Sequence, residues 1–408
     1  MDMRSYQETL RRLAPVCQYF AHYVTRERCR RLHICGIVPK SWLLSHWVTD
    51  TLQRLEPVES LRTYVKECAI QEWDDFLERS EVVTQFVKSF LPQFLPLMSS
   101  LVNLRILTLR ITPISYFLLQ AVGRLQGLEE LVIYGCPIRG LGGDHPEEPI
   151  FGVNETPFPA LRQLNIEKER SLDIHTVFKD AFCTLVGATT LRSLVISSAW
   201  SHFLLPHISQ HLVSLSGDFS SVPFDRFLQF LKTRISLQHL TICSDTAPWF
   251  PDYEDEDGNL LPFPPFHLDK DVLPDLRSFS GPSGMAPELI RGRPVTRLAM
   301  GCNLPRQFFD IPLTSLYGLT VFPHTHWANY RWEDHMAYDE VWHDLKTIGG
   351  DILELFVRVG DDSLSLISPC FPNLVHLEIE LWDRVFVSHS CTPVMYTEIT
   401  CYRKKGLT

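Results

Sequence analysis

The sequence lacks most of the short motifs that mark enzymes and metal sites. None of its 11 cysteines forms a Cys-x-x-Cys pair, and it contains no Gly-x-Ser-x-Gly turn. The Gly-rich stretch at residues 140–144 ends without the Lys-Ser or Lys-Thr of a phosphate-binding loop. These absences argue against a redox dithiol, an α/β-hydrolase triad and a P-loop. We therefore expect no catalytic residues, no bound metal and no cofactor.

Long apolar runs are also missing. No stretch of 18 or more apolar residues is present, although a membrane-spanning helix needs about that many. The opening residues, MDMRSYQETLRR, are too polar for a signal peptide. The apolar fraction of 45% and the charged fraction of 21% are typical of a folded soluble protein. We expect a cytoplasmic or nuclear protein with reduced cysteines and no contact with a membrane.

The charge is divided unevenly along the chain. Residues 1–66 carry 11 Lys and Arg against 6 Asp and Glu, a net charge of 11 − 6 = +5. Since the whole chain has a net charge of −10, the remaining residues carry −15. An acidic body without a basic stripe repels a phosphate backbone, so nucleic acid is not an expected ligand. A basic protein partner stays compatible with this charge.

A recurring phrase, Leu-x-x-Leu-x-(Leu/Ile/Val), is the strongest signal in the chain. Its copies and two degraded relatives start about 19 to 39 residues apart, a somewhat stretched leucine-rich-repeat period. One such unit cannot bury its apolar edge alone, so each copy must stack on the next. The phrase predicts an irregular α/β solenoid of short parallel strands with helical or irregular returns. The copies start at Leu104, Leu128, Leu161, Leu191, Leu212, Leu237, Leu276, Val295, Leu316, Ile352 and Leu374.

Alternation along each predicted strand separates a buried face from an open face. Side chains of a strand point to opposite sides by turns, so the positions between the leucines should face the concave side of the solenoid. Aromatic side chains, Arg and carboxylates are mixed there, as on protein-binding surfaces, although each alone could be an ordinary exposed residue. The expected partner-binding residues are Arg110, Glu130, Tyr134, Gln163, Asn165, Glu167, His239, Thr241, Phe322, Phe356, Arg358, His376 and Glu378.

The segments outside the regular phrase suggest a cap and two insertions. Residues 5–33 and 74–101 have apolar positions at helical spacing, with Pro92 and Pro96 kinking or breaking the end of the second segment. A cap is needed because a terminal repeat would expose apolar surface. The Gly-, Pro- and acid-rich segments 139–159 and 244–266 should be surface loops. We expect helices in 1–33, a cap with degenerate repeats in 34–101, and the array in 102–408.

One histidine-rich segment offers an alternative from the enzyme class. A cluster of His, Glu and Asp could bind zinc for hydrolysis, but no pair has the His-Glu-x-x-His spacing of a helical site. An aromatic-rich helix or loop between repeats explains the same composition. The candidate ligands within residues 322–343 are His324, His326, Glu333, Asp334, His335, Asp339 and His343.

The opening residues resemble part of a known family. TLRRLAPVCQYFAHYVTRERCRRLHI, about 25 residues, is similar to the second half of an F-box, with its Leu-x-x-Leu-x-x-Val-Cys-x-x-Phe core. The F-box and leucine-rich-repeat proteins of mushroom-forming fungi show this arrangement. The family's preceding Leu-Pro and acidic helix do not occur before Tyr6. Residues that match the core, and that would contact an adaptor, are Leu10, Leu13, Val16, Cys17 and Phe20.

This resemblance implies a function for the whole chain. In that family, the F-box binds a Skp-type adaptor of a cullin–RING (SCF) ubiquitin ligase, and the repeats hold the protein to be ubiquitinated. The chain would then be a substrate receptor without catalysis of its own. An alternative is a leucine-rich-repeat scaffold with no ubiquitin link, in which residues 5–33 only cap the array. The identity of the bound protein is not encoded in any motif.

Overall fold

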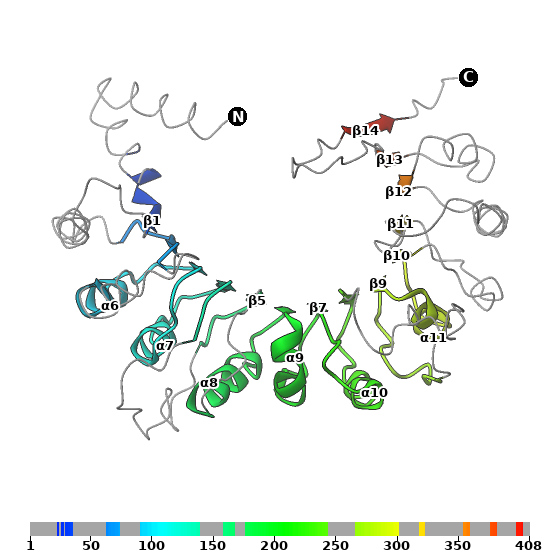
Figure 1. The fold of residues 1–408 in the computed structure, drawn as a ribbon, viewed down its shortest axis with the longest axis horizontal. Coiled ribbons are helices and arrows are strands. Elements are labelled where there is room, and N and C mark those ends of the chain that lie inside the picture. Colours follow the sequence, from blue (N-terminus) through cyan, green and yellow to red (C-terminus); the bar gives the residue numbers. More distant parts are fainter. Residues whose placement is uncertain are drawn as a thin grey trace, which may run out of the picture. The chain divides into compact units, whose positions relative to one another are not determined.

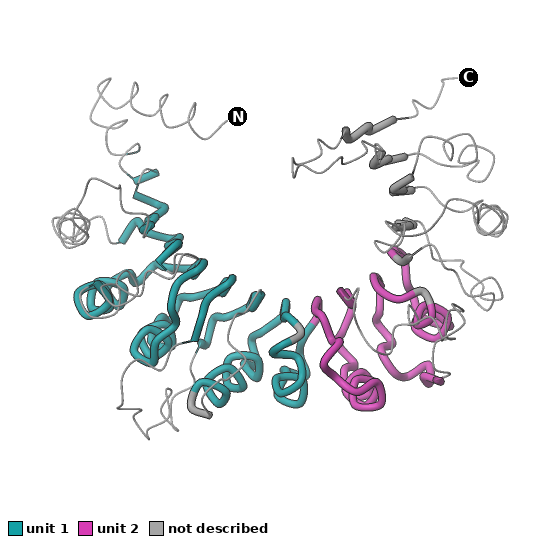
Figure 2. Tube along the Cα trace, in the orientation of Figure 1, with its two compact units in different colours: residues 1–212 teal, residues 213–408 magenta. Residues whose placement is uncertain are grey.

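The chain divides into two compact units, residues 1–212 and residues 213–408 (Figure 2). Each unit carries its own run of strands and helices. From residue 300 onward, only the backbone of the strands is described. The computed structural model describes residues 23, 26–27, 29–35, 63–73, 90–138, 158–167, 176–243, 266–301, 318–322, 354–359, 376–381 and 397–402.

Unit 1 contains a parallel sheet in which each strand pairs with the next along the chain. Equivalent residues of successive strands are aligned, so that Leu107 lies beside Leu131, and Leu131 beside Leu164. This constant register means that each repeat advances the chain by one strand position. The strands are β1 (Arg31–Cys35), β2 (Glu67–Gln71), β3 (Ile106–Arg110), β4 (Glu130–Tyr134), β5 (Gln163–Glu167) and β6 (Ser193–Ile196).

Unit 2 continues the same construction until its last strand. Strands β7 to β13 are parallel neighbours in chain order, whereas β14 pairs antiparallel with β13. The expectation of an entirely parallel sheet is therefore wrong at β14, which is not a copy of the leucine phrase. The strands are β7 (Ser214–Gly217), β8 (His239–Ile242), β9 (Ser278–Gly281), β10 (Arg297–Gly301), β11 (Gly318–Phe322), β12 (Glu354–Val359), β13 (His376–Leu381) and β14 (Thr397–Tyr402).

Helices and irregular segments return the chain from one strand to the next. Figure 1 shows that, within each unit, the helices lie on one side of the strands. Among the described residues, no helix combines the length and apolarity needed to cross a bilayer. Unit 1 contains α6 (Leu91–Ser99), α7 (Tyr116–Gly123), α8 (Thr176–Val186), α9 (Ser198–Leu204) and the 3-10 helix η2 (Leu205–His207), and unit 2 contains α10 (Phe224–Lys232), η3 (Ser283–Met285) and α11 (Ala286–Ile290).

The leucines of the recurring phrase form the core, which confirms the predicted solenoid. In the repeat that contains β3, for example, Leu104, Leu107 and Leu109 are at most 1% exposed. Removing a leucine side chain from water contributes about 1.5 to 3 kcal/mol, and each repeat contributes several such residues. Exposure is at most 3% at Leu128, Leu131, Leu161, Leu164, Leu191, Leu194, Leu212, Leu215, Leu237, Leu240, Leu276, Val295 and Leu298.

The returning helices complete this core with large side chains. Helix α7 begins after Ser115, whose hydroxyl accepts a hydrogen bond from the Leu118 amide at 3.2 Å and so caps the helix. In α8 and α9, Phe182 and Trp200 meet edge to face with ring centroids 4.2 Å apart. The apolar layer beneath the sheet is thus closed by side chains from both strands and helices.

The turn after each of two strands is fixed by a short polar side chain. The Thr112 hydroxyl donates to the Ile70 carbonyl at 3.0 Å, and the Cys136 thiol donates to the Leu109 carbonyl at 3.3 Å. Both residues stand five positions after the second leucine of their repeat, where Asn or Cys is frequent in leucine-rich repeats. Each side chain therefore ties its turn to the preceding strand and helps to hold the repeat spacing.

Three sequence expectations are wrong in detail. Residues 31–33 belong to β1, although they were expected to be helical. Pro96 lies inside α6 without ending it, and Pro92 lies in its first turn, where its missing N–H leaves no intrahelical bond unmade. The first expected surface loop, 139–159, lies outside the described residues except for its last two, and of these Phe158 is buried in the core at 1% exposure.

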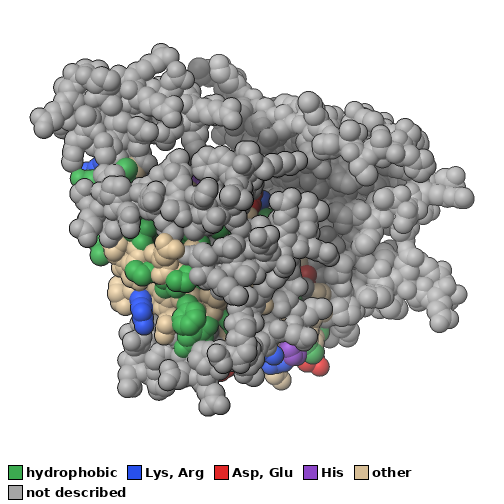
Figure 3. Space-filling view, turned by 60° about the vertical axis from the view of Figure 1, so that its left-hand side comes forward, with side chains coloured by type: hydrophobic (Ala, Val, Ile, Leu, Met, Phe, Trp, Pro, Cys, Tyr) green, Lys and Arg blue, Asp and Glu red, His purple; other side chains and the backbone are tan. Residues whose placement is uncertain are grey.

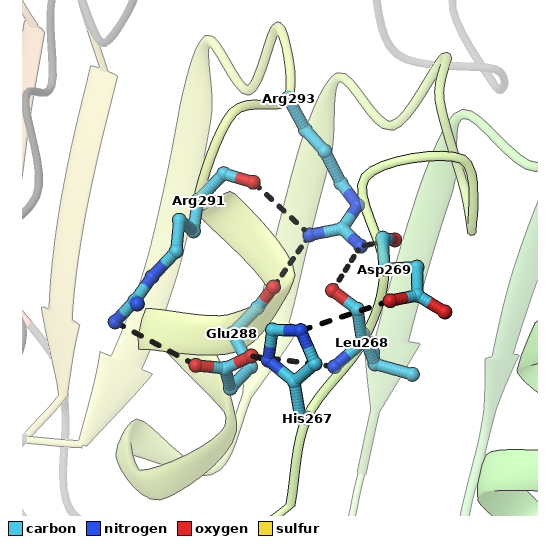
Figure 4. A network of polar contacts seen from close by, with 6 residues as sticks. All are labelled: His267, Leu268, Asp269, Glu288, Arg291 and Arg293. Atoms are coloured by element: carbon cyan, nitrogen blue, oxygen red, sulfur yellow. Dashed lines mark hydrogen bonds and ion pairs between the residues drawn. The ribbon is translucent and has the colours of Figure 1, made fainter.

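Two buried arginines of unit 2 have opposite environments. The Arg293 guanidinium donates to the Val272 and Asp269 carbonyls, each at 2.7 Å. Figure 4 shows its contacts with Leu268, Asp269, Glu288 and Arg291. Arg234 is also 5% exposed, yet its Nε and Nη1 atoms have no hydrogen-bond partner. Its guanidinium carbon lies 4.5 Å from the centre of the Phe230 ring, a cation–π contact. Burial lowers the pKa of both guanidinium groups.

The two arginines should therefore respond differently to replacement by methionine. Arg293→Met leaves several buried carbonyls without a donor and should lower the free energy of unfolding by about 3 kcal/mol. Arg234→Met removes a buried cation without acceptors and keeps an apolar contact with Phe230, so we expect a change within about 1 kcal/mol of zero. Urea unfolding of both variants measures this difference.

The pair serves as its own control, because burial and substitution are the same at both sites. Equal losses of stability in the two variants would contradict the role assigned to the Arg293 carbonyl contacts.

Candidate functional site

The side of the unit 1 sheet opposite the leucines forms the candidate binding surface, here called the open face. Its side chains stand in three rows, because the strands share one register. None of these side chains is fully buried. The first row is Arg31, Glu67, Ile106, Glu130, Gln163 and Ser193; the middle row is His33, Ala69, Thr108, Val132, Asn165 and Val195; the third row is Cys35, Gln71, Arg110, Tyr134 and Glu167.

This arrangement brings together the sequence-predicted residues of three strands. Glu130 lies beside Gln163 in the first row, and Arg110, Tyr134 and Glu167 are consecutive in the third row. The side chain of Asn165 lies between these rows. The register places all six on one side of the sheet, and their role in partner binding stays a prediction.

The third row has a defined contact between a cation and an aromatic ring. The Arg110 guanidinium carbon lies 5.3 Å from the centre of the Tyr134 ring, within the range of a cation–π interaction. This contact holds the Tyr134 ring over the sheet, beside Glu167 on the next strand. A large, oriented aromatic side chain of this kind is the usual anchor of a protein interface.

The middle row contains a polar group without a partner. Asn165 is flanked in register by Val132 and Val195, and its Oδ1 atom is closed off from solvent without a hydrogen bond. The Oγ atom of Ser197, directly after β6, is also closed off from solvent without a hydrogen bond. Asparagine is depleted in strands, and a buried acceptor without a donor costs about 1 to 3 kcal/mol. The open face therefore carries unsatisfied hydrogen-bonding capacity in the unbound protein.

The structure adds two strands that the leucine phrase does not reveal. Strands β1 and β2 place Ile34, Cys68 and Ile70 where later repeats have leucines, so the phrase is absent there. On the open face, the Gln71 amide nitrogen contacts the His33 ring nitrogen. The apolar-polar alternation of RLHIC and ECAIQ was the available signal, but each is short.

The remaining predicted face residues belong to unit 2. His239 is exposed, and its Nδ1 atom lies 2.9 Å from the Ser278 hydroxyl on β9. Thr241 stands between Ser216 and Ser280 in the same register. The backbone register aligns Phe356 with Glu378 and Glu354 with His376, and it places Phe322 at the end of β11 and Arg358 in β12. The unit 2 strands thus repeat the row pattern with small hydroxyl residues near β8.

Two other predicted sites lie outside the described residues. Leu10, Leu13, Val16, Cys17 and Phe20 of the F-box-like segment belong to this group, as do the histidines of residues 323–343. In the part of the chain that the structure describes, no three His, Cys, Asp or Glu side chains gather as metal ligands would. Burial raises the pKa of the Cys68 thiol to about 12, so this thiol stays protonated at neutral pH and serves packing.

Comparisons with known proteins give the following likenesses. No family model and no curated protein matches the chain. An internalin from Listeria monocytogenes has 14% identity and a TM-score of 0.30, covering 85% of this chain and 92% of its own. A chain of the Drosophila Toll–Spatzle complex has 14% identity and a TM-score of 0.35, covering 87% of this chain and 47% of its own. A leucine-rich-repeat protein of Leptospira interrogans has 9% identity and a TM-score of 0.22, covering 78% of this chain and 91% of its own.

The chain spans less than half the length of the matched Toll–Spatzle chain. The leucine-rich-repeat fold of this chain is established by its own features: the parallel register, the buried leucines and the one-sided helices.

The unsatisfied oxygen of Asn165 leads to a stability prediction. Asn165→Val places a β-branched side chain between Val132 and Val195 and removes the buried acceptor, so the free energy of unfolding should rise by about 1 kcal/mol. Thr108→Val, in the same row of β3, is the matched control and should have a smaller effect, because the Thr108 side chain is not among the buried unsatisfied groups. Urea unfolding tests this, and a loss of stability in Asn165→Val would contradict it.

Proposed function

We propose that the chain is a protein-binding scaffold and that the open face of β3 to β6 holds its protein partner. The observation that carries this proposal is the half-buried middle row, where apolar Val132 and Val195 flank an acceptor without a donor. Among the described residues, the helices lie on the leucine side of these strands (Figure 1). A partner that lies on the open face would bury the valines and supply the missing hydrogen bond.

The mixture of side chains on the open face supports protein binding over other roles. Tyr134 and Arg110 belong to the residue types that dominate interface energetics, and the valines provide apolar contact area. The rows repeat from strand to strand along the sheet, as suits a folded or extended protein segment. We therefore infer a scaffold that acts through binding and leaves catalysis to its partners.

We propose further that this scaffold is the substrate receptor of an SCF-type ubiquitin ligase. The support is the likeness of Leu10, Leu13, Val16, Cys17 and Phe20 to the core of an F-box, joined to a repeat array. In this arrangement, the N-terminal segment binds a Skp-type adaptor, and the open face holds the protein to be ubiquitinated. The origin in a mushroom-forming fungus and a place in the cytoplasm or nucleus belong to the same proposal.

A repeat scaffold without any link to ubiquitin is the alternative. It rests on the solenoid alone, with the N-terminal segment serving only as a cap that shields the first strand. The two proposals share the open face and differ in the role of residues 5–33.

Figure 3 shows apolar side chains gathered on part of the described surface, with few charged side chains among them. Phe117, on helix α7, is a 63% exposed apolar side chain of unit 1. Its position on the helix makes it a suitable control site for substitutions on the open face.

The open face should be required for partner binding. Three tagged chains are isolated from cells of the source organism: the wild type, the double variant Val132→Glu with Val195→Glu, and Phe117→Glu. The proteins that co-purify with each are compared by quantitative mass spectrometry. We expect at least one protein to be depleted about tenfold by the double substitution, since buried carboxylates without partners oppose binding. The Phe117→Glu control should retain that protein. Equal retention by all three chains would contradict the assignment of the open face.

Adaptor binding separates the two proposals. The chain is extended at its N-terminus with the family's Leu-Pro and acidic helix, and co-expressed with a Skp-type adaptor. The receptor proposal predicts co-purification, and it predicts a loss of at least tenfold in affinity for Leu13→Asp with Phe20→Asp, because these side chains would be buried in the contact. If the extended chain fails to retain the adaptor, the ubiquitin link is refuted and the simple scaffold stands.

A further inference from the structure

Three hydrogen-bond acceptors converge on the open face around β5. Asn165 and Glu167 stand two residues apart in β5, on the same side of the sheet. Ser197 lies beside Glu167, because its amide donates to the Ile166 carbonyl at 2.9 Å. From ordinary strand spacings, the three Cα atoms lie within about 8 Å of one another. We call Asn165, Glu167 and Ser197 the acceptor cluster.

Two of these acceptors are closed to water and lack a partner. The Asn165 Oδ1 and Ser197 Oγ atoms make no hydrogen bond in the described structure. In register, Val132 and Val195 stand on either side of Asn165. The two polar atoms are therefore enclosed in the unbound protein, and a donor reaches them only when the side chains around them move. A ligand that satisfies them must bring donors and must tolerate contact with the valine methyl groups.

The charge of the surrounding face decides which donor fits. Glu130 and Glu167 form no ion pair with any described residue, whereas Glu67 is already paired with Arg31 at 2.6 Å. The Arg110 side chain, from β3, is engaged over the Tyr134 ring. The strands β4 and β5 thus present two uncompensated carboxylates on the open face. A positively charged donor is favoured there over a neutral or anionic one.

We propose that the acceptor cluster binds an arginine or lysine side chain of the protein partner. The inference rests on the proposed function, since it names the chemistry of the partner that the open face holds. A guanidinium donates to the Glu167 carboxylate, and on binding the Asn165 and Ser197 side chains turn so that their enclosed oxygens accept from its remaining N–H groups. The aliphatic part of the same side chain contacts Val132 and Val195. Arginine fits better than lysine, because its planar fork reaches several acceptors at once.

The probe for this proposal is a phage-displayed library of random 12-residue peptides, selected on the full chain. Selected peptides are synthesised, and their affinity is measured by calorimetry for the wild type and for variants. The proposal predicts a consensus with one dominant Arg or Lys flanked by apolar residues. Glu167→Gln and Asn165→Leu should each weaken these peptides about tenfold, as expected for the loss of a charge-assisted hydrogen bond.

Glu67→Gln is the matched control, because it removes a carboxylate of the same face that Arg31 already neutralises. It should change the affinity less than twofold. The charge reversal Glu167→Lys adds a gain of function: peptides in which Glu replaces the consensus Arg should bind this variant better than the wild type. This result does not depend on a loss that misfolding could imitate.

The outcomes separate this inference from the proposed function. Suppose that Tyr134→Ala or Val132→Glu lowers the affinity of the peptides but Glu167→Gln and Asn165→Leu do not. The proposed binding of an Arg or Lys side chain by the acceptor cluster is then refuted, while the open face remains the binding surface. If no selected peptide responds to any substitution on the open face, the proposed function fails together with the inference. A consensus rich in Asp or Glu among the peptides selected on the wild-type chain would also contradict the proposed binding of an Arg or Lys side chain.

Discussion

The alternation of side chains along short parallel strands is the constraint on which the rest of this structure depends. A repeat of this size buries its leucines only by stacking on its neighbours, so successive strands must keep one register. Burial of Leu131 and Ile133 then leaves Glu130, Val132 and Tyr134 on the opposite side. Burial of the leucines stabilises the core, and strand alternation then places the residues between them on the open face.

The irregularity of the repeats is compatible with this constraint because different side chains fix the turns. Thr112 and Cys136 both bridge to the preceding strand, although one uses a hydroxyl and the other a thiol. In unit 2, Arg293 stabilises a turn by donating to several carbonyls, and in unit 1 Arg192 also donates to several carbonyls. The strands can thus stay in register while the returns vary in length and helix content, and the register alone determines which side chains share a row.

The sequence predicts the parts of the fold that the leucines themselves encode. The phrase identified β3 to β13 and assigned Asn165 and Tyr134 to the open face, because period-two alternation is a local property. It missed β1 and β2, where Ile34 and Cys68 replace leucines, and it could not foresee that β14 runs antiparallel. The position of Asn165 between Val132 and Val195 depends on strand pairing with residues about 30 positions away in the sequence, and only the assembled sheet shows it.

The central claim is that this face of the sheet is open in the free protein and available to a partner. Cysteine substitution along β4, followed by maleimide labelling of the folded chain relative to the wild type, tests it most directly. The account predicts fast labelling at Glu130→Cys, Val132→Cys and Tyr134→Cys and protection at Leu131→Cys and Ile133→Cys. Equal protection at all five positions would show that the face is covered, and reversed alternation would show that the register is wrong.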